Sequence, residues 1–282
     1  MTDLNKREKL IAVICYLAYS AVLTLQRHEP FALIYFAFVA LTVFFADKLI
    51  KSDTIKCKTL TSFFITAVGY QTTFEIFYSV HNDFKQILSA VAVAVFYACV
   101  FMLTDKSKLP WCIGAVPVLC ALNVRIAIGF CVLLLCLSVM SLGKKAEKIN
   151  LISTAISAAG LIACIIIALT ADGYFLENSR YLLERFKNPV FLIIIAAYLA
   201  VKLIRNKAVS TAKICICLAL TVAVTVFATL TLGWTVFALM SLCLPLLLGL
   251  VCLNDSRTAS AIRSDFEKNK LIFIAVIICS LQ

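Results

Sequence analysis

Long apolar runs, separated by short charged connections, constrain the fold of this chain more than any other feature. A helix that crosses a bilayer needs roughly 20 largely apolar residues. Runs of about this length fill most of the sequence, at residues 10–25, 31–46, 59–80, 87–104, 109–122, 125–143, 150–171, 190–204, 213–231, 234–253 and 271–281. We therefore expect an all-α fold, a polytopic transmembrane helical bundle of 10–11 helices in one integral membrane domain over residues 1–282.

Composition excludes the main soluble classes. Apolar residues make up 63% of the chain and charged residues 15%, against about a quarter charged in soluble domains. A soluble enzyme, a disordered chain and a disulfide-stabilised secreted domain are therefore excluded. Most of the 13 cysteines lie inside apolar runs, where a free cysteine behaves as a small hydrophobic residue. We expect them to pack between helices rather than to bind metal or form disulfides.

Two of the runs meet their neighbours at tight turns. The polar step Asn123-Val124-Arg125 divides residues 109–143, which are too long for one crossing, and Gly233-Trp234 divides 213–253. With both divisions, alternate connections hold 20 of the 26 Lys and Arg residues. The positive-inside rule then makes the N-terminus cytoplasmic. The net charge of +11 falls on this side, where it suits anionic lipid of the bilayer rather than nucleic acid.

The last apolar run, residues 271–281, is too short to cross a bilayer alone. It is interpreted either as a segment at the membrane interface or as the start of a crossing in a longer gene product. We favour the second interpretation.

Polar residues inside such a bundle are the first candidates for function, because inserting them into a membrane is unfavourable. Gln71, Glu75 and Tyr78 follow an i, i+4, i+7 spacing in the third run and share one helix face. Glu75 is a candidate catalytic carboxylate, and Gln71 and Tyr78 are candidate binding residues. The alternative is a structural hydrogen-bonded group within the bundle.

Three basic or titratable residues lie near the predicted outer ends of other helices. Arg125 opens the sixth run and is either a fixed cation for an anionic head group or an anchor whose guanidinium reaches the interface. His28 and His81 fall in outer connections, where either is a candidate general base; two loop histidines are also expected by chance.

The longest outer connection, 172–189, has apolar residues at helical spacing and charged residues between them. We interpret it as an outer amphipathic connection along the membrane surface. It either caps the bundle or presents Arg180 and Arg185 over its outer mouth. The inner connections contain no glycine-rich phosphate loop and no Cys–His metal spacing, so no cofactor and no metal are predicted.

The order of these features resembles the O-antigen ligase and polymerase family of bacterial membrane glycan transferases. The resemblance covers roughly residues 120–195 and rests on Asn123-Val124-Arg125, Lys144-Lys145, Asn178-Ser179-Arg180 and Asn188-Pro189. It implies a multi-pass protein of the bacterial cytoplasmic membrane that acts on glycan linked to undecaprenyl diphosphate. Arg125 and Arg180 would bind the diphosphate, and His28, His81 or Glu75 would activate the acceptor hydroxyl without a metal.

Two other functions remain open from the sequence. Ten crossings with both ends inside is also the layout of drug and metabolite exporters, in which Glu75 would bind a proton or substrate. The third interpretation is a non-catalytic membrane subunit, since no strong motif is present.

Overall fold

The computed structural model describes residues 5–27, 32–50, 58–59, 61–62, 65–66, 83–141, 148–170, 189–232, 234–269 and 271–272. These residues form helices and contain no strand. The predicted all-α fold is therefore confirmed. The candidate residues at positions 71, 75 and 78 lie outside the described residues, as does the connection 172–189 except for its last residue, Pro189.

The long helices follow the predicted apolar runs. They are α1 (Lys6–Arg27), α2 (Ala32–Phe44), α5 (Asp83–Met102), α6 (Leu109–Gly114), α7 (Val116–Leu122), α8 (Val124–Ser141), α9 (Lys148–Thr170), α11 (Pro189–Arg205), α12 (Thr211–Leu232) and α13 (Trp234–Asn254). Three further elements lie in the connections: α3 (Ala46–Leu49), the 3-10 turn η1 (Lys106–Lys108) and α14 (Ser256–Lys268). Helix α14 is the principal difference from prediction, because its residues were assigned to a charged connection.

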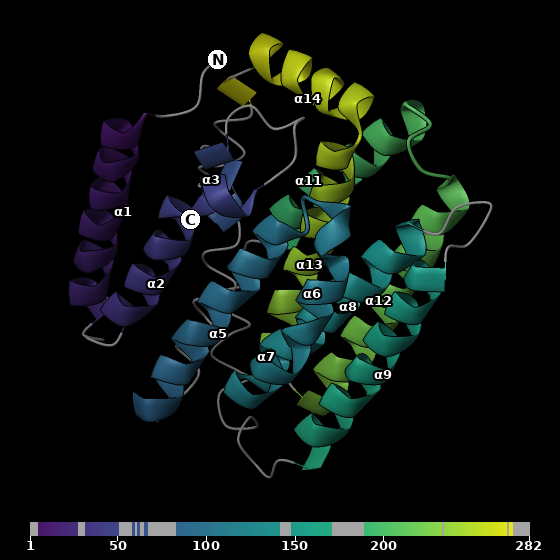
Figure 1. The fold of residues 1–282 in the computed structure, drawn as a ribbon, viewed down its shortest axis with the longest axis horizontal. Helices are drawn as coiled ribbons and strands as arrows, with labels where there is room; N and C mark the ends of the chain where they lie inside the picture. Colours follow the sequence, from purple (N-terminus) through teal and green to yellow (C-terminus); the bar gives the residue numbers. More distant parts are fainter. Residues whose placement is uncertain are drawn as a thin grey trace.

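The long helices lie side by side, and α14 contacts α13 and α11 and lies across the end of the bundle that also holds α3 and the start of α1 (Figure 1). Two contacts between helix ends agree with the predicted alternation of the connections between the two sides of the membrane. Lys9 pairs with Asp47 across 3.2 Å, and the Nζ of Lys213 donates to the carbonyl of Met140 across 3.2 Å. Each pair joins helix ends that the predicted alternation puts on the same side.

We call the end of the bundle that α14 crosses the basic end, because most described Lys and Arg residues lie there. They belong to the start of α1, to α3, to the end of α11, to the turn into α12 and its start, and to α14: Lys6, Arg7, Lys9, Lys48, Lys202, Arg205, Lys207, Lys213, Arg257, Arg263 and Lys268. The opposite end of the bundle, which we call the far end, holds the junction of α7 with α8 (Figure 1). That the basic end faces the cytoplasm stays a prediction.

Helix α8 is the central helix of the bundle. It packs against α7, α9, α12 and α13, and 83% of its residues Val124–Ser141 are buried by protein. The corresponding shares are 28% for α9 and 22% for α12. Isoleucine and leucine side chains on these outer helices, such as Ile162 and Ile166, are more than half exposed, which suits contact with lipid.

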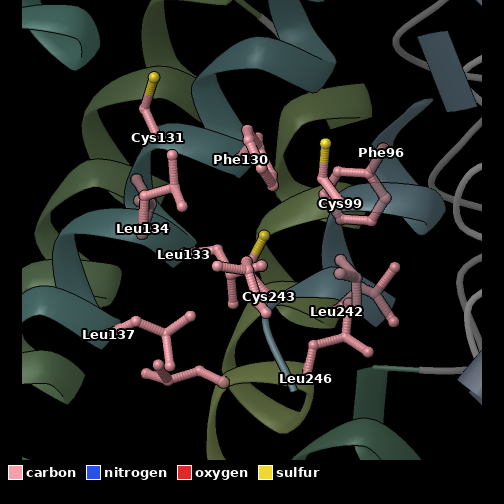
Figure 2. Packing of buried hydrophobic residues seen from close by; sticks show 14 of the residues in the cluster. Phe96, Cys99, Phe130, Cys131, Leu133, Leu134, Leu137, Leu242, Cys243 and Leu246 are labelled. Atoms are coloured by element: carbon pink, nitrogen blue, oxygen red, sulfur yellow. The ribbon is translucent and has the colours of Figure 1, made fainter. Parts of the chain in front are cut away.

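Apolar side chains of α5, α8 and α13 meet in the middle of the bundle (Figure 2). Phe96 of α5 contacts Phe130 of α8 edge to face, with ring centroids 5.9 Å apart. Leu133 and Cys243 are 1% and 2% exposed. Close packing is what stabilises the association of these helices. Lipid tails are as apolar as the side chains, so burial from water does not drive helix association within a membrane.

The described cysteines are free, and most are buried in helix contacts as predicted. The thiol of Cys243 donates to the carbonyl of Gly129 across 3.3 Å. Cys136 and Cys217 donate to each other's carbonyls, across 3.9 and 3.6 Å. These cysteines therefore join α8 to α12 and α13 as small packing residues.

Four described helices are long and apolar enough to cross a membrane: Phe84–Met102, Val124–Ser141, Leu151–Thr170 and Thr211–Thr229. A fifth is counted if the bent pair Leu242–Asn254 and Ser256–Lys268 forms one span. Several apolar helices of this kind indicate an integral, multi-pass membrane protein. The total of ten or eleven crossings and the cytoplasmic N-terminus stay predictions.

Candidate functional site

Arg125 is the one predicted site residue that lies within the described parts of the chain. Its side chain is 2% exposed, at the second position of α8. The predicted site residues outside the described residues are Gln71, Glu75, Tyr78, His28, His81, Arg180 and Arg185. The grouping of these residues with Arg125 therefore stays a prediction.

The burial of Arg125 distinguishes between the two interpretations of this residue. An interfacial anchor extends its guanidinium past the end of the helix into the head-group layer. Arg125 instead lies inside the bundle, on the helix that the others surround. Arginine keeps its charge under all ordinary conditions, so a buried arginine in a membrane helix is a costly residue and a candidate for function.

Asn123 forms the junction between α7 and α8. Its backbone is extended, with φ −159° and ψ 106°, so the helix cannot continue through it. The side-chain Oδ1 accepts hydrogen bonds from the backbone N–H groups of Arg125, across 3.1 Å, and Ile126, across 3.4 Å. Asn123 thus caps α8, which is a preferred role of asparagine, and fixes where Arg125 enters the bundle.

A third helix takes part in this junction. The Nδ2 of Asn123 donates to the hydroxyl of Ser89 on α5 across 3.0 Å. Ser89 is 2% exposed, and Gln86, one turn earlier on the same face, is 5% exposed. We call Gln86, Ser89, Asn123 and Arg125 the polar cluster. It lies around the hydrogen bond that joins the second turn of α5 to the junction of α7 with α8, at the far end of the bundle.

Arg125 and the Asn123 step could be recognised from the sequence, whereas Gln86 and Ser89 were missed. The available signal was their i, i+3 spacing near the start of an otherwise apolar helix. Such pairs are common at helix ends, and only the packing of α5 against α8 distinguishes this pair.

The charge distribution of the polar cluster favours an anion. Arg125 is the second residue of α8, so its side chain starts from the helix N-terminus, which carries a partial positive charge from its aligned peptide dipoles. The four side chains supply hydrogen-bond donors and one full charge. They contain no carboxylate or imidazole, so the polar cluster can bind and orient an anionic group but has no general base of its own.

Metal binding has no support among the residues that the structure describes. They include no group of three or more His, Cys, Asp and Glu side chains placed to hold an ion. Comparisons with protein-family models, curated proteins and solved structures give no match for this chain. Functional inference therefore depends on the polar cluster itself.

Proposed function

We propose that this chain is a multi-pass protein of a bacterial cytoplasmic membrane that transfers or polymerises glycan linked to undecaprenyl diphosphate. The observation that carries the proposal is the buried Arg125 beside the N-terminus of the central helix, at the end of the bundle opposite the basic end. This end corresponds to the predicted outer face, where lipid-linked glycan would be used.

A diphosphate suits the chemistry of the polar cluster. The planar guanidinium presents paired N–H donors that match two phosphate oxygens. The dipole of α8 adds to the attraction, while Ser89 and Asn123 hold the start of α8 against α5. In the same proposal, Arg180 and Arg185 contact the donor lipid, and Glu75, His28 or His81 activates the acceptor hydroxyl.

The first test measures binding. The full chain is purified in detergent and titrated with undecaprenyl diphosphate and with undecaprenol, which has no charged head group. Charge-assisted hydrogen bonds contribute about 1.5–3 kcal/mol each, so Arg125→Gln is expected to weaken diphosphate binding by at least roughly tenfold. Arg125→Lys keeps the charge but loses the paired donors, and its effect should be intermediate.

Arg205→Gln is the matched control, because Arg205 is an exposed arginine at the basic end. It should bind undecaprenyl diphosphate like the unsubstituted chain. Equal binding of the diphosphate and the alcohol, or equal loss in the two Gln variants, would refute the role of Arg125. Thermal stability in detergent is measured for each variant to show that it is folded.

The second test measures transfer. Vesicles containing the chain receive a lipid-linked oligosaccharide and an acceptor, and the products are separated by size. Longer or ligated glycan that disappears in Arg125→Gln is expected. Absence of product, together with pH-dependent uptake of a solute that Glu75→Gln abolishes, would instead assign the chain to the transporter class.

A further inference from the structure

Helix α14 changes direction sharply where α13 ends. The two helices meet at 108°, and only Asp255 separates Asn254 from Ser256. The Asp255 carboxylate caps α14 by accepting from the backbone N–H and the hydroxyl of Thr258, across 2.8 and 2.6 Å. Since α13 is apolar along its length, a helix that begins at its end and turns across it lies at the level of the membrane surface.

One face of α14 is fixed to the bundle. The hydroxyl of Tyr198 on α11 donates to the Asp265 carboxylate across 2.9 Å, and Lys202, one turn further along α11, forms an ion pair with the same carboxylate. The amide of Asn206 donates to the Thr258 hydroxyl across 3.2 Å. These contacts hold the length of α14 across the end of α11 and set which of its faces points away from the bundle.

The basic residues of α14 lie on the two flanks of the helix. At 100° per residue, Arg257 and Lys268 share one flank and Arg263 lies on the other. All three are exposed, and Arg263 also pairs with Glu267 across 3.1 Å. The exposed positions between the flanks hold Ser256, Ser260, Ser264 and, beside Arg263, the carboxylate of Glu267. Positive charge is therefore concentrated at the edges, at the height of the surrounding head groups, rather than on top.

Apolar residues follow α14 directly. Leu271 and Ile272 are 82% and 64% exposed, and the sequence stays apolar as far as Leu281. A helix with one face on protein, basic flanks and an apolar continuation has the pattern of an interfacial helix.

We propose that α14 is an interfacial helix that binds anionic phospholipid of the surrounding leaflet through Arg257, Arg263 and Lys268. Lipid fits better than an acidic protein, because the basic residues are on the flanks and the face between them holds serines and the Glu267 carboxylate, which would repel an acidic partner. The adjacent exposed Leu271 and Ile272 also suit acyl chains. The proposal does not depend on the transferase function, since α14 is at the opposite end from the polar cluster.

Hydrogen exchange of the full chain in lipid nanodiscs tests this proposal. Exchange in α14 is compared between discs of phosphatidylcholine and discs that also contain phosphatidylglycerol. A basic residue near an anionic surface contributes roughly a fivefold preference. Phosphatidylglycerol is therefore expected to slow exchange in α14 by at least about fivefold, and 1 M salt should remove the slowing.

The variant Arg257→Gln with Lys268→Gln is expected to lose the slowing. The control variant, Lys6→Gln with Arg7→Gln, removes the same charge from exposed residues at the start of α1 and should keep it. Arg257→Lys with Lys268→Arg conserves charge and should also keep it, which separates charge from folding of the helix.

Three results would overturn the proposal. The first is equal exchange of α14 in the two kinds of disc. The second is loss of slowing in the charge-conserving variant, or its retention in the Gln variant. The third is equal slowing by an acidic peptide in phosphatidylcholine discs, which would assign the surface to a protein partner.

Discussion

Replacing Asn123 by alanine should remove both the side-chain cap of α8 and the hydrogen bond that joins this junction to Ser89 of α5. Loss of a helix cap typically destabilises by about 1 kcal/mol. Loss of the hydrogen bond to the buried Ser89 hydroxyl adds about 1 to 2 kcal/mol. Asn123→Ala is therefore expected to lower the free energy of unfolding by about 2 to 3 kcal/mol, from the hydrogen bonds that Asn123 makes with α8 and Ser89.

Ser89→Ala removes only the bond between the helices. It is expected to destabilise by about 1 to 2 kcal/mol, because it leaves the Asn123 amide short of a partner. In the double variant the bond is lost once rather than twice. A coupling energy of about 1 kcal/mol between the two substitutions follows.

Reversible unfolding in mixed micelles, followed by circular dichroism during titration with dodecyl sulfate, measures these free energies. Ser260→Ala on the exposed face of α14 is the matched control and should change stability by less than about 0.5 kcal/mol. Additive effects of Asn123→Ala and Ser89→Ala, within the ~0.3 kcal/mol typical of independent sites, would refute the account of the junction.

Two further predictions concern helix packing and α14. A Cβ at Gly160 would lie at ordinary contact distance, 3.5 Å from Val116 Cγ1 and 3.6 Å from Cys131 Sγ. Gly160→Ala should therefore fit and raise the free energy of unfolding by up to about 1 kcal/mol, whereas Gly160→Leu should lower it by about 1 to 3 kcal/mol. The same unfolding titration measures both changes. Lys202, as the main cause, lowers the pKa of Asp265, so this carboxylate stabilises α14 above its ordinary pKa of about 4 and stops doing so as the pH falls through the lowered value. Hydrogen exchange in α14, corrected for intrinsic rates, should become faster over that acidic range. In the Asp265→Asn variant, exchange in α14 should be fast at both neutral and acidic pH. Exchange in this variant as slow as in the unsubstituted chain at neutral pH would contradict the prediction.

The helices could be predicted from sequence because lipid imposes a simple rule on composition. Each described long helix occupies an apolar run, and the division at Asn123 was readable because a polar residue followed by arginine interrupts a run too long for one crossing. The alternation of basic connections also agrees with the way the described helix ends meet.

Helix α14 was missed for the opposite reason. Its apolar positions are few, and its inward face is completed by polar residues such as Thr258 and Asp265, which become structural only through their contacts with α11. Asp255 three residues before Thr258 was the local signal, since this spacing suits a helix cap. The polar cluster was only half predicted, because the partners of Asn123 come from a helix more than 30 positions away in the sequence.

The burial of α8 places two separate demands on the same 18 residues. During biosynthesis the segment must be apolar enough to leave the translocon for lipid before its later neighbours exist. In the finished bundle the same side chains must match the shapes of the five helices that contact α8, namely α5, α7, α9, α12 and α13. Natural variation in α8 should therefore be limited in both polarity and side-chain volume. The lipid-facing positions of α9 and α12 need only be apolar, so they should vary freely among apolar residues.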